Sequence, residues 1–276
     1  MKINFALNIL LFASLFFASC ANSPAPLSSD EKKGELYYQH GTEKLLGKDY
    51  TQALDFLLKA HKLKPNDTKV ENNLGMAYYF KKQIAKSKEH LVRAVTIDPK
   101  NSDARNNLAS LYLETGEYEL AESEYNKILE DLLYTTQFTT YYNLALVSLK
   151  RNKVPSAIDH LKKSLKENED YCPSYYLLGG IYKKQYRYKD ALDMFRRGTH
   201  GSCYNNPAPL YEQAMIQIEM NDLKRASEKL QEIIEKFPGT KYQVMASDKL
   251  KEFKEKTDNR QYKVMSDQKN FVTPTF

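Results

Sequence analysis

Small and apolar residues return at a fixed interval along this chain, and this pattern predicts its secondary structure. One small residue recurs at steps of 34, 34, 36, 34 and 35 residues, and a second small residue stands twelve positions before each of them. The recurring residues are Ala53, Ser87, Ala121, Ala157, Ala191 and Ala226, and their partners are Gly41, Gly75, Ala109, Ala145, Gly179 and Ala214. A period near 34 is typical of stacked helix pairs, with the small side chains where two helix backbones approach closely.

Other positions keep the same period. A leucine precedes the small partner at Leu74, Leu108, Leu144 and Leu178, and Pro65, Pro99 and Pro238 end second helices. Together these positions resemble the tetratricopeptide repeat (TPR). The resemblance implies an all-α fold, a right-handed superhelical solenoid of six repeats over residues 34–240. A helix at 241–256 is expected to cap the last apolar face, since the ends of a solenoid need a polar cover.

The turns inside the repeats contain residues that tolerate unusual backbone angles. Gly47, Gly116 and Asn221 stand where a first helix should stop. Glycine and asparagine accept the positive φ that commonly ends a helix, so we expect them to take it here.

The N-terminus has the pattern of an export signal. An apolar run extends from Phe5 to Phe17 and is followed by Ala18, Ser19 and Cys20, which predicts a signal peptide over residues 1–19. The segment resembles a bacterial lipobox, which implies that Cys20 is lipidated and that residues 20–33 form a flexible tether. Ala21 after the cysteine resembles lipoproteins sent to the outer membrane, so we expect a lipid-anchored protein that faces the periplasm. The alternative is an ordinary cleaved signal in which Cys20 has no special role.

Charge and composition add little about partners. The net charge is +6 and the lysines are spread over the predicted outer helix faces, so nucleic acid is not an expected partner. The tail at 257–276 is polar with scattered aromatic residues, and we expect disorder there, with capture by a partner as the alternative.

Catalytic and metal-binding patterns are missing. The sequence has no HExxH, no GxSxG and no glycine-rich phosphate loop, and its five histidines lack ligand spacing, so they are interpreted as half-buried structural residues. We therefore expect no enzyme activity, no cofactor, no metal and no small-molecule substrate. Cys172 and Cys203 fall at the two ends of the fifth repeat, which antiparallel helices bring to one edge. A disulfide and two unpaired thiols both remain open.

A binding surface is predicted on the first helix of each repeat, which lines the concave face of such arrays. Amide side chains recur there, flanked by tyrosines and by an apolar floor, as suits an extended peptide or an amphipathic helix. The candidate groove residues are Tyr38, Gln39, Leu45, Asn72, Asn73, Met76, Tyr79, Asn106, Asn107, Leu113, Tyr142, Asn143 and Leu146. The alternative for each asparagine is that it only joins neighbouring helices.

A lipobox, a short tether and six repeats in a chain of this length resemble the type IV pilus pilotins of the PilF/PilW and Tgl family. The segments 131–134, 142–149 and 153–157, with two extra residues and Pro155, carry the likeness further. The resemblance implies an outer-membrane lipoprotein that binds a secretin subunit and promotes its localisation and multimerisation. The alternative is a TPR lipoprotein adaptor, facing the periplasm, for a cell-wall synthesis or outer-membrane assembly complex.

Overall fold

The computed structural model describes residues 28–253 and 255, with only the backbone of Ser202. The predicted signal peptide, Cys20, most of the tether and the tail at 257–276 lie outside these residues. Every regular element described is a helix, so the predicted all-α class is confirmed for this part of the chain. The chain divides into two compact units, one ending at Ala104 and one beginning at Arg105, and each is described by itself.

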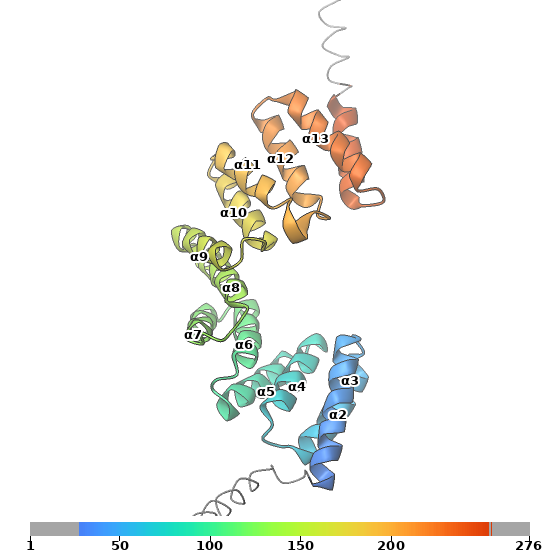
Figure 1. The fold of residues 1–276 in the computed structure, drawn as a ribbon, viewed down its shortest axis with the longest axis vertical. Coiled ribbons are helices and arrows are strands. Elements are labelled where there is room, and N and C mark those ends of the chain that lie inside the picture. The colour runs from blue at the N-terminus through green and yellow to red at the C-terminus, as the bar shows by residue number, and fades with distance from the viewer. Residues whose placement is uncertain (1–27, 254, 256–276) are drawn as a thin grey trace, which may run out of the picture. The chain divides into compact units, whose positions relative to one another are not determined.

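Unit 1 contains two antiparallel helix pairs (Figure 1). The helices are α2 (Ser29–Leu46), α3 (Tyr50–Leu63), α4 (Thr68–Phe80) and α5 (Ile84–Ile97). Helix α2 packs on α3, α3 on α4, and α4 on α5. A capping box at Ser28 and Glu31 starts α2, and the Asp67 carboxylate accepts the backbone N–H groups of Lys69 and Val70 at the start of α4.

Unit 2 continues the same arrangement. Its helices are α6 (Ser102–Thr115, whose first three residues belong to unit 1), α7 (Tyr118–Leu129), α8 (Gln137–Lys150), α9 (Val154–Glu167), α10 (Cys172–Lys184), α11 (Tyr188–Arg197), α12 (Ala208–Glu219) and α13 (Leu223–Lys236), with a short 3-10 helix η1 (Gly201–Cys203) before α12. A further helix covers 241–253, and its Ala246 is fully buried in a cluster with Leu210 and Leu230. This helix therefore covers apolar surface of α12 and α13.

The recurring small residues are fully buried, and the glycines among them sit under a large side chain. A Cβ atom on Gly41 would lie 2.6 Å from Leu57 Cγ, and one on Gly75 would lie 2.6 Å from Leu91 Cγ. The sequence pattern pairs each glycine with the small residue twelve positions later, for example Gly41 with Ala53. The atoms nearest to the missing Cβ instead belong to the residue sixteen positions later, which is Leu57 for Gly41. The reason is that helical side chains point toward the N-terminus of their helix and cover the preceding turn.

The turns between paired helices correct one expectation. A residue with φ between 57° and 84° lies five positions before each recurring small residue. These residues are Lys48, Lys82, Gly116, Asn152, Tyr186 and Asn221. Gly116 and Asn221 were expected there, whereas Gly47 has a φ of −73° and its neighbour Lys48 takes the positive φ. The helix ends one residue later than the position of the glycine suggests.

Within 28–253 and 255, none of the helices combines the length and the apolar character needed to cross a bilayer.

Candidate functional site

The candidate groove residues of unit 1 lie on α2 and α4, which contact each other. Tyr38 and Leu45 pack partly buried against the core of this unit, and the exposed Gln39 donates from Nε2 to Glu35 Oε1 at 3.5 Å. Met76 and Tyr79 are half-buried. Only part of the surface of Tyr38, Leu45, Met76 and Tyr79 is therefore accessible to a partner.

The two asparagines of α4 are tied into the fold. Asn72 Nδ2 donates to Asn73 Oδ1 at 3.2 Å, and Asn73 Nδ2 donates to Thr42 Oγ1 on α2 at 2.8 Å. Thr42 in turn donates to the backbone carbonyl of Tyr38 at 2.9 Å. This chain of hydrogen bonds joins α4 to α2, which favours the structural interpretation for Asn73. A binding role for these amides stays a prediction.

Further apolar and aromatic side chains lie at the ends of α2 and α4 and at the start of α3, and only Tyr79 among them belongs to the predicted groove residues. Leu46, at the end of α2, is 78% exposed, and Phe80, at the end of α4, is 39% exposed. The Phe80 ring stacks on Tyr50 at 4.7 Å and meets Tyr79 edge-on at 5.2 Å. We call Leu46, Tyr50, Tyr79 and Phe80 the unit 1 patch. Leu46 and Phe80 occupy the thirteenth repeat position, an inward-facing one, so the repeat register could have found them.

The candidate residues of unit 2 lie on α6 and α8 and are half-buried. They are Asn106, Asn107, Leu113, Tyr142, Asn143 and Leu146. Asn106 Oδ1 is buried without a hydrogen-bond partner. The Tyr142 ring lies 5.6 Å from that of Tyr171, and burial raises the pKa of both hydroxyl groups. Tyr142 is thus largely a packing residue.

A buried charge cluster in unit 1 escaped the sequence analysis. The Glu71 carboxylate is fully buried, with Oε1 3.0 Å from both His61 Nδ1 and Arg93 Nε, and Oε2 2.7 Å from His90 Nδ1. We call Glu71, His61, His90 and Arg93 the Glu71 cluster. It joins α3, α4 and α5, and Arg93 also donates to the backbone carbonyl of Pro65 at 2.8 Å. Its signal in the sequence is a charge at the fourth repeat position. The third repeat also has a charge there, Arg105, whereas the other repeats have Tyr37, Tyr141, Tyr175 or Leu210.

This cluster does not form a metal site. Each imidazole Nδ1 faces a carboxylate oxygen, and the Arg93 guanidinium occupies the side where a cation would have to bind. Across residues 28–253 and 255, no group of three or more His, Cys, Asp or Glu side chains is arranged to hold a metal ion.

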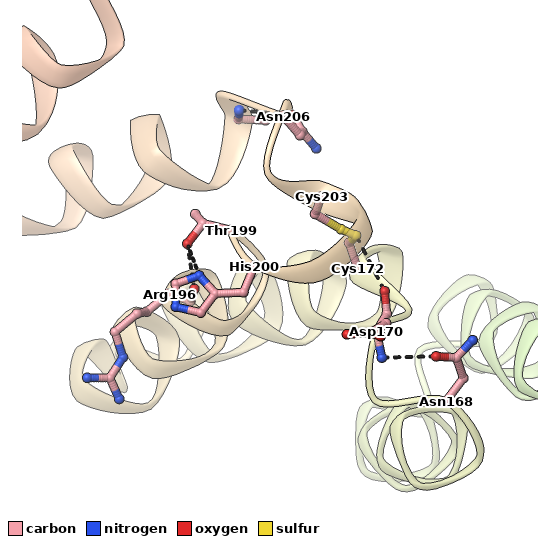
Figure 2. The surroundings of a disulfide bond; sticks show 9 residues. Asn168, Asp170, Cys172, Arg196, Thr199, His200, Cys203 and Asn206 are labelled. Atoms are coloured by element: carbon pink, nitrogen blue, oxygen red, sulfur yellow. Dashed lines mark hydrogen bonds between the residues drawn. A yellow bond between two sulfur atoms is a disulfide. The ribbon is translucent and has the colours of Figure 1, made fainter. Parts of the chain in front are cut away.

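Cys172 and Cys203 are joined by a disulfide, with their Cα atoms 6.0 Å apart (Figure 2). The bond links the start of α10 to the end of η1. In the loop before Cys172, the backbone N–H of Asp170 donates to Asn168 Oδ1 at 2.9 Å (Figure 2). The fifth helix pair is therefore closed into a covalent loop.

Comparison with known proteins places this geometry in a class. The tetratricopeptide repeat family matches residues 81–132 and 210–240. Together with the helix pairs, these matches confirm the predicted fold class, an all-α array of tetratricopeptide-type repeats. Tetratricopeptide-repeat proteins mediate protein–protein interactions.

The particular likeness is to type IV pilus factors, and the predicted resemblance is confirmed. The chain is 26% identical to the type IV pilus assembly protein PilF of Pseudomonas aeruginosa over 204 residues, 72% of this chain and 81% of PilF. Its fold matches the solved structure of P. aeruginosa PilF with a TM-score of 0.66 at 21% identity, covering 80% of this chain and all of that one. PilW, a widely conserved type IV pilus biogenesis factor, also matches with a TM-score of 0.66 at 21% identity, covering 76% of this chain and 96% of PilW.

Two further similarities cover a smaller share of this chain. The anaphase-promoting complex subunit CDC16 of Saccharomyces cerevisiae is 30% identical over 120 residues, which is 41% of this chain but 14% of CDC16. A structure of MamA matches with a TM-score of 0.52 at 21% identity over 61% of this chain and 91% of MamA.

Proposed function

We propose that this chain is a non-catalytic assembly factor for the type IV pilus secretin, held by a lipid on Cys20 at the outer membrane and facing the periplasm. The observation that carries the proposal is the likeness to PilF across 81% of that protein. The N-terminal apolar run that ends at Cys20 supports export and anchoring. In this role the chain binds a secretin subunit and promotes its multimerisation without making or breaking covalent bonds.

The unit 1 patch is the surface we assign to the secretin. It combines an exposed leucine with three aromatic rings on rigid helix ends, and such rings dominate the binding energy of many protein interfaces. It also follows the tether most closely along the chain, so a lipid-anchored protein would present it near the membrane. The half-buried Met76 supplies a further apolar edge on α4.

Deletion of the gene tests the role. The expected result is loss of secretin multimers from outer-membrane fractions on an immunoblot, with recovery by the full chain but not by Cys20→Ser. Unchanged multimers in the deletion strain would dismiss the proposal and leave the adaptor for a cell-wall or outer-membrane assembly complex as the alternative.

One substitution tests the assigned surface. Because the Leu46 side chain is mostly exposed, Leu46→Glu should leave the free energy of unfolding within about 0.5 kcal/mol of the wild type. It should nevertheless reduce the amount of secretin that copurifies with the full chain. Val92→Glu is the matched control, since Val92 is an exposed aliphatic residue on the second helix of the same unit. Equal secretin capture by both variants would refute the assignment.

A further inference from the structure

The first helix pair of unit 1 has a face that no neighbouring pair covers. In later pairs the first helix packs on the second helix of the pair before it, as α4 does on α3, α8 on α7, α10 on α9 and α12 on α11. Within residues 28–253 and 255, no helix precedes α2. The side of α2 that corresponds to these contacts is therefore open.

The third repeat position shows what this leaves exposed. In the second to fifth repeats it is fully buried, at Val70, Ala104, Thr140 and Ser174. In the first repeat it is Leu36, whose side chain is 51% exposed. The ends of a repeat array normally carry polar residues, and the exposed His40 and Glu43 on the later turns of α2 follow this rule. Leu36, on an earlier turn, does not.

Aromatic rings and lysine stems extend the apolar surface around Leu36. Tyr37 and Phe56 are half-buried, with ring centroids 6.4 Å apart. Lys33 Nζ lies 5.9 Å from the Tyr37 ring centroid, and Lys59 Nζ lies 5.5 Å from that of Phe56. We call Lys33, Leu36, Tyr37, Phe56 and Lys59 the end face. Aromatic rings with lysines at their edge suit a bilayer interface, where the rings sit at headgroup level and the lysine stems lie along apolar surface.

The end face lies close to the predicted tether. Cys20 precedes Ser28 by eight residues. An extended chain spans at most about 3.5 Å per residue, so Ser28 stays within roughly 28 Å of a lipid attached to Cys20. Helix α2 begins at Ser29, and Leu36 lies about 10 Å along it. Among the described residues, Leu36 is the first exposed large apolar side chain after the tether.

The charges around the end face do not select its occupant. Lys59 Nζ lies 2.7 Å from Asp55 Oδ2, and His40 Nδ1 lies 3.8 Å from Glu43 Oε2, so these charges are compensated locally. The attraction must therefore come from apolar burial. A small apolar surface is sufficient here, because an anchor on the same chain keeps the bilayer at a high effective concentration.

We infer that the end face docks on the bilayer surface, with Leu36 and the rings of Tyr37 and Phe56 at the level of the lipid headgroups. The inference deepens the proposed function and rests on its lipid anchor at Cys20. Docking at the start of α2 leaves Leu46, at the other end of this helix, in water. The unit 1 patch is then free to bind a partner while the chain is held on the membrane.

The chain contains no tryptophan, so a single introduced indole reports its own surroundings. The probe is Leu36→Trp in the chain from Cys20 onward, with the Cys20 thiol coupled to a maleimide lipid in phosphatidylcholine vesicles. Cys172 and Cys203 are joined in the disulfide, which leaves Cys20 for the coupling. In vesicles with brominated acyl chains the indole should lose at least about half of its emission, because interfacial side chains reach roughly 5–10 Å into the headgroup boundary.

Matched variants locate the contact. Leu46→Trp and Val92→Trp place the indole at other exposed aliphatic positions of unit 1 and should keep nearly all of their emission. Adding Lys59→Glu to Leu36→Trp should restore most of the lost emission, because a carboxylate beside the Phe56 ring would have to leave water. Lys69→Glu makes the same change of charge at an exposed position on α4 and should restore none. Added salt should leave the quenching unchanged, since the attraction is apolar.

Equal quenching of Leu36→Trp and Leu46→Trp, or no quenching of either, would overturn the inference. An emission shift of Leu36→Trp that grows with protein concentration without vesicles would also overturn it, because a second copy would then cover the end face. The coupling supplies the anchor chemically, so the result does not depend on secretin multimers or on lipidation in the cell. Failure of the proposed function and failure of this inference are therefore distinguishable.

Discussion

Replacing Glu71 by glutamine tests whether the Glu71 cluster holds the first two helix pairs together. The substitution keeps the shape of the side chain and removes its charge. The carboxylate is hydrogen-bonded to His90 Nδ1 and lies 3.0 Å from both His61 Nδ1 and Arg93 Nε on the two neighbouring helices. A glutamine can replace part of this set while presenting its own N–H₂ group to the rest. We therefore expect Glu71→Gln to lower the free energy of unfolding of unit 1.

The magnitude follows from the three contacts. Hydrogen bonds to a charged group are worth about 1.5–3 kcal/mol when buried, which applies to the contact with the mostly buried His90. His61 is half-buried, so we assign about 1 kcal/mol to its contact. The Arg93 side chain is 46% exposed, so water screens its contact and it contributes about 0.5 kcal/mol. Glutamine recovers roughly 1 kcal/mol as an acceptor, which leaves a net loss of about 2–3.5 kcal/mol.

The assay must resolve the affected region, since repeat arrays do not always unfold in a single step. Urea unfolding followed by circular dichroism gives the total loss, and amide hydrogen exchange in α3, α4 and α5 shows where opening becomes easier. Glu89→Gln, on the exposed face of α5, is the matched control and should change stability by less than about 0.5 kcal/mol. Arg93→Met should cost less in the Glu71→Gln background than in the wild type.

Equal losses from Glu71→Gln and Glu89→Gln would refute this reasoning, and so would additive effects of Glu71→Gln and Arg93→Met. Either result would mean that the carboxylate gains no more from its partners than it loses by leaving water.

Four further substitutions probe the turns, the helix crossings and a helix cap. Lys48→Gly should raise stability by about 0.5–1 kcal/mol in a thermal melt, because glycine accepts the φ of 62° without strain; a lower melting temperature would contradict the strain argument. Gly179→Ala should destabilise the protein by about 1–3 kcal/mol, because the new Cβ would lie 2.9 Å from the Phe195 ring on α11. Gly180→Ala should stabilise it by up to roughly 1 kcal/mol, because the space there is open and alanine favours the helix. If both variants raise or both lower the melting temperature, crowding does not distinguish the two positions. Asp67 is partly buried, which by itself raises its pKa, but hydrogen bonds from Lys64 and from two backbone amides outweigh burial and hold the pKa of this carboxyl below its usual value. Its contribution is therefore complete above the unfolded pKa and is lost as pH falls through the folded pKa. Asp67→Asn should therefore destabilise by about 1 kcal/mol at neutral pH and much less once the pH falls below the folded pKa of this carboxyl; a gap that persists in strong acid would refute the electrostatic part.

The sequence predicted the helix pairs well because their period is set by packing. Ala53 and Gly41 stand at a fixed spacing because the backbones of α2 and α3 approach closely there. Helix pairs that cross in this way need small residues at the same spacing, so the sequence shows the pattern. The turn residues were predicted less well. Lys48 adopts a left-handed conformation although lysine is not a residue type that favours it. The backbone N–H groups of Lys48 and Asp49 donate to carbonyls at the end of α2, and these hydrogen bonds impose the conformation whatever the side chain.

The candidate surface was harder to predict for a physical reason. Asn73 looks like a binding residue because amides suit peptides, but the same donor reaches Thr42 on the adjacent helix at 2.8 Å. Sequence spacing places both on one face and cannot decide which partner the amide takes. Leu46 stands at an inward-facing repeat position that the register could have picked out, but its exposure, like the open space beside Gly180, is visible in the structure alone.

The charges at equivalent repeat positions explain how similar repeats keep their own partners. In the second repeat Glu71 faces His90 and Arg93, and at the same three positions of the third repeat Arg105 faces Glu124, which Lys127 also contacts at 2.7 Å. A helix that slipped by one repeat would bring Glu71 against Glu124 and leave Arg93 beside Arg105. Like charges in a partly buried contact are strongly unfavourable, and arrays of similar repeats are prone to such misassembly. The reversed polarity therefore selects the native pairing where the apolar pattern, which is the same in both repeats, cannot.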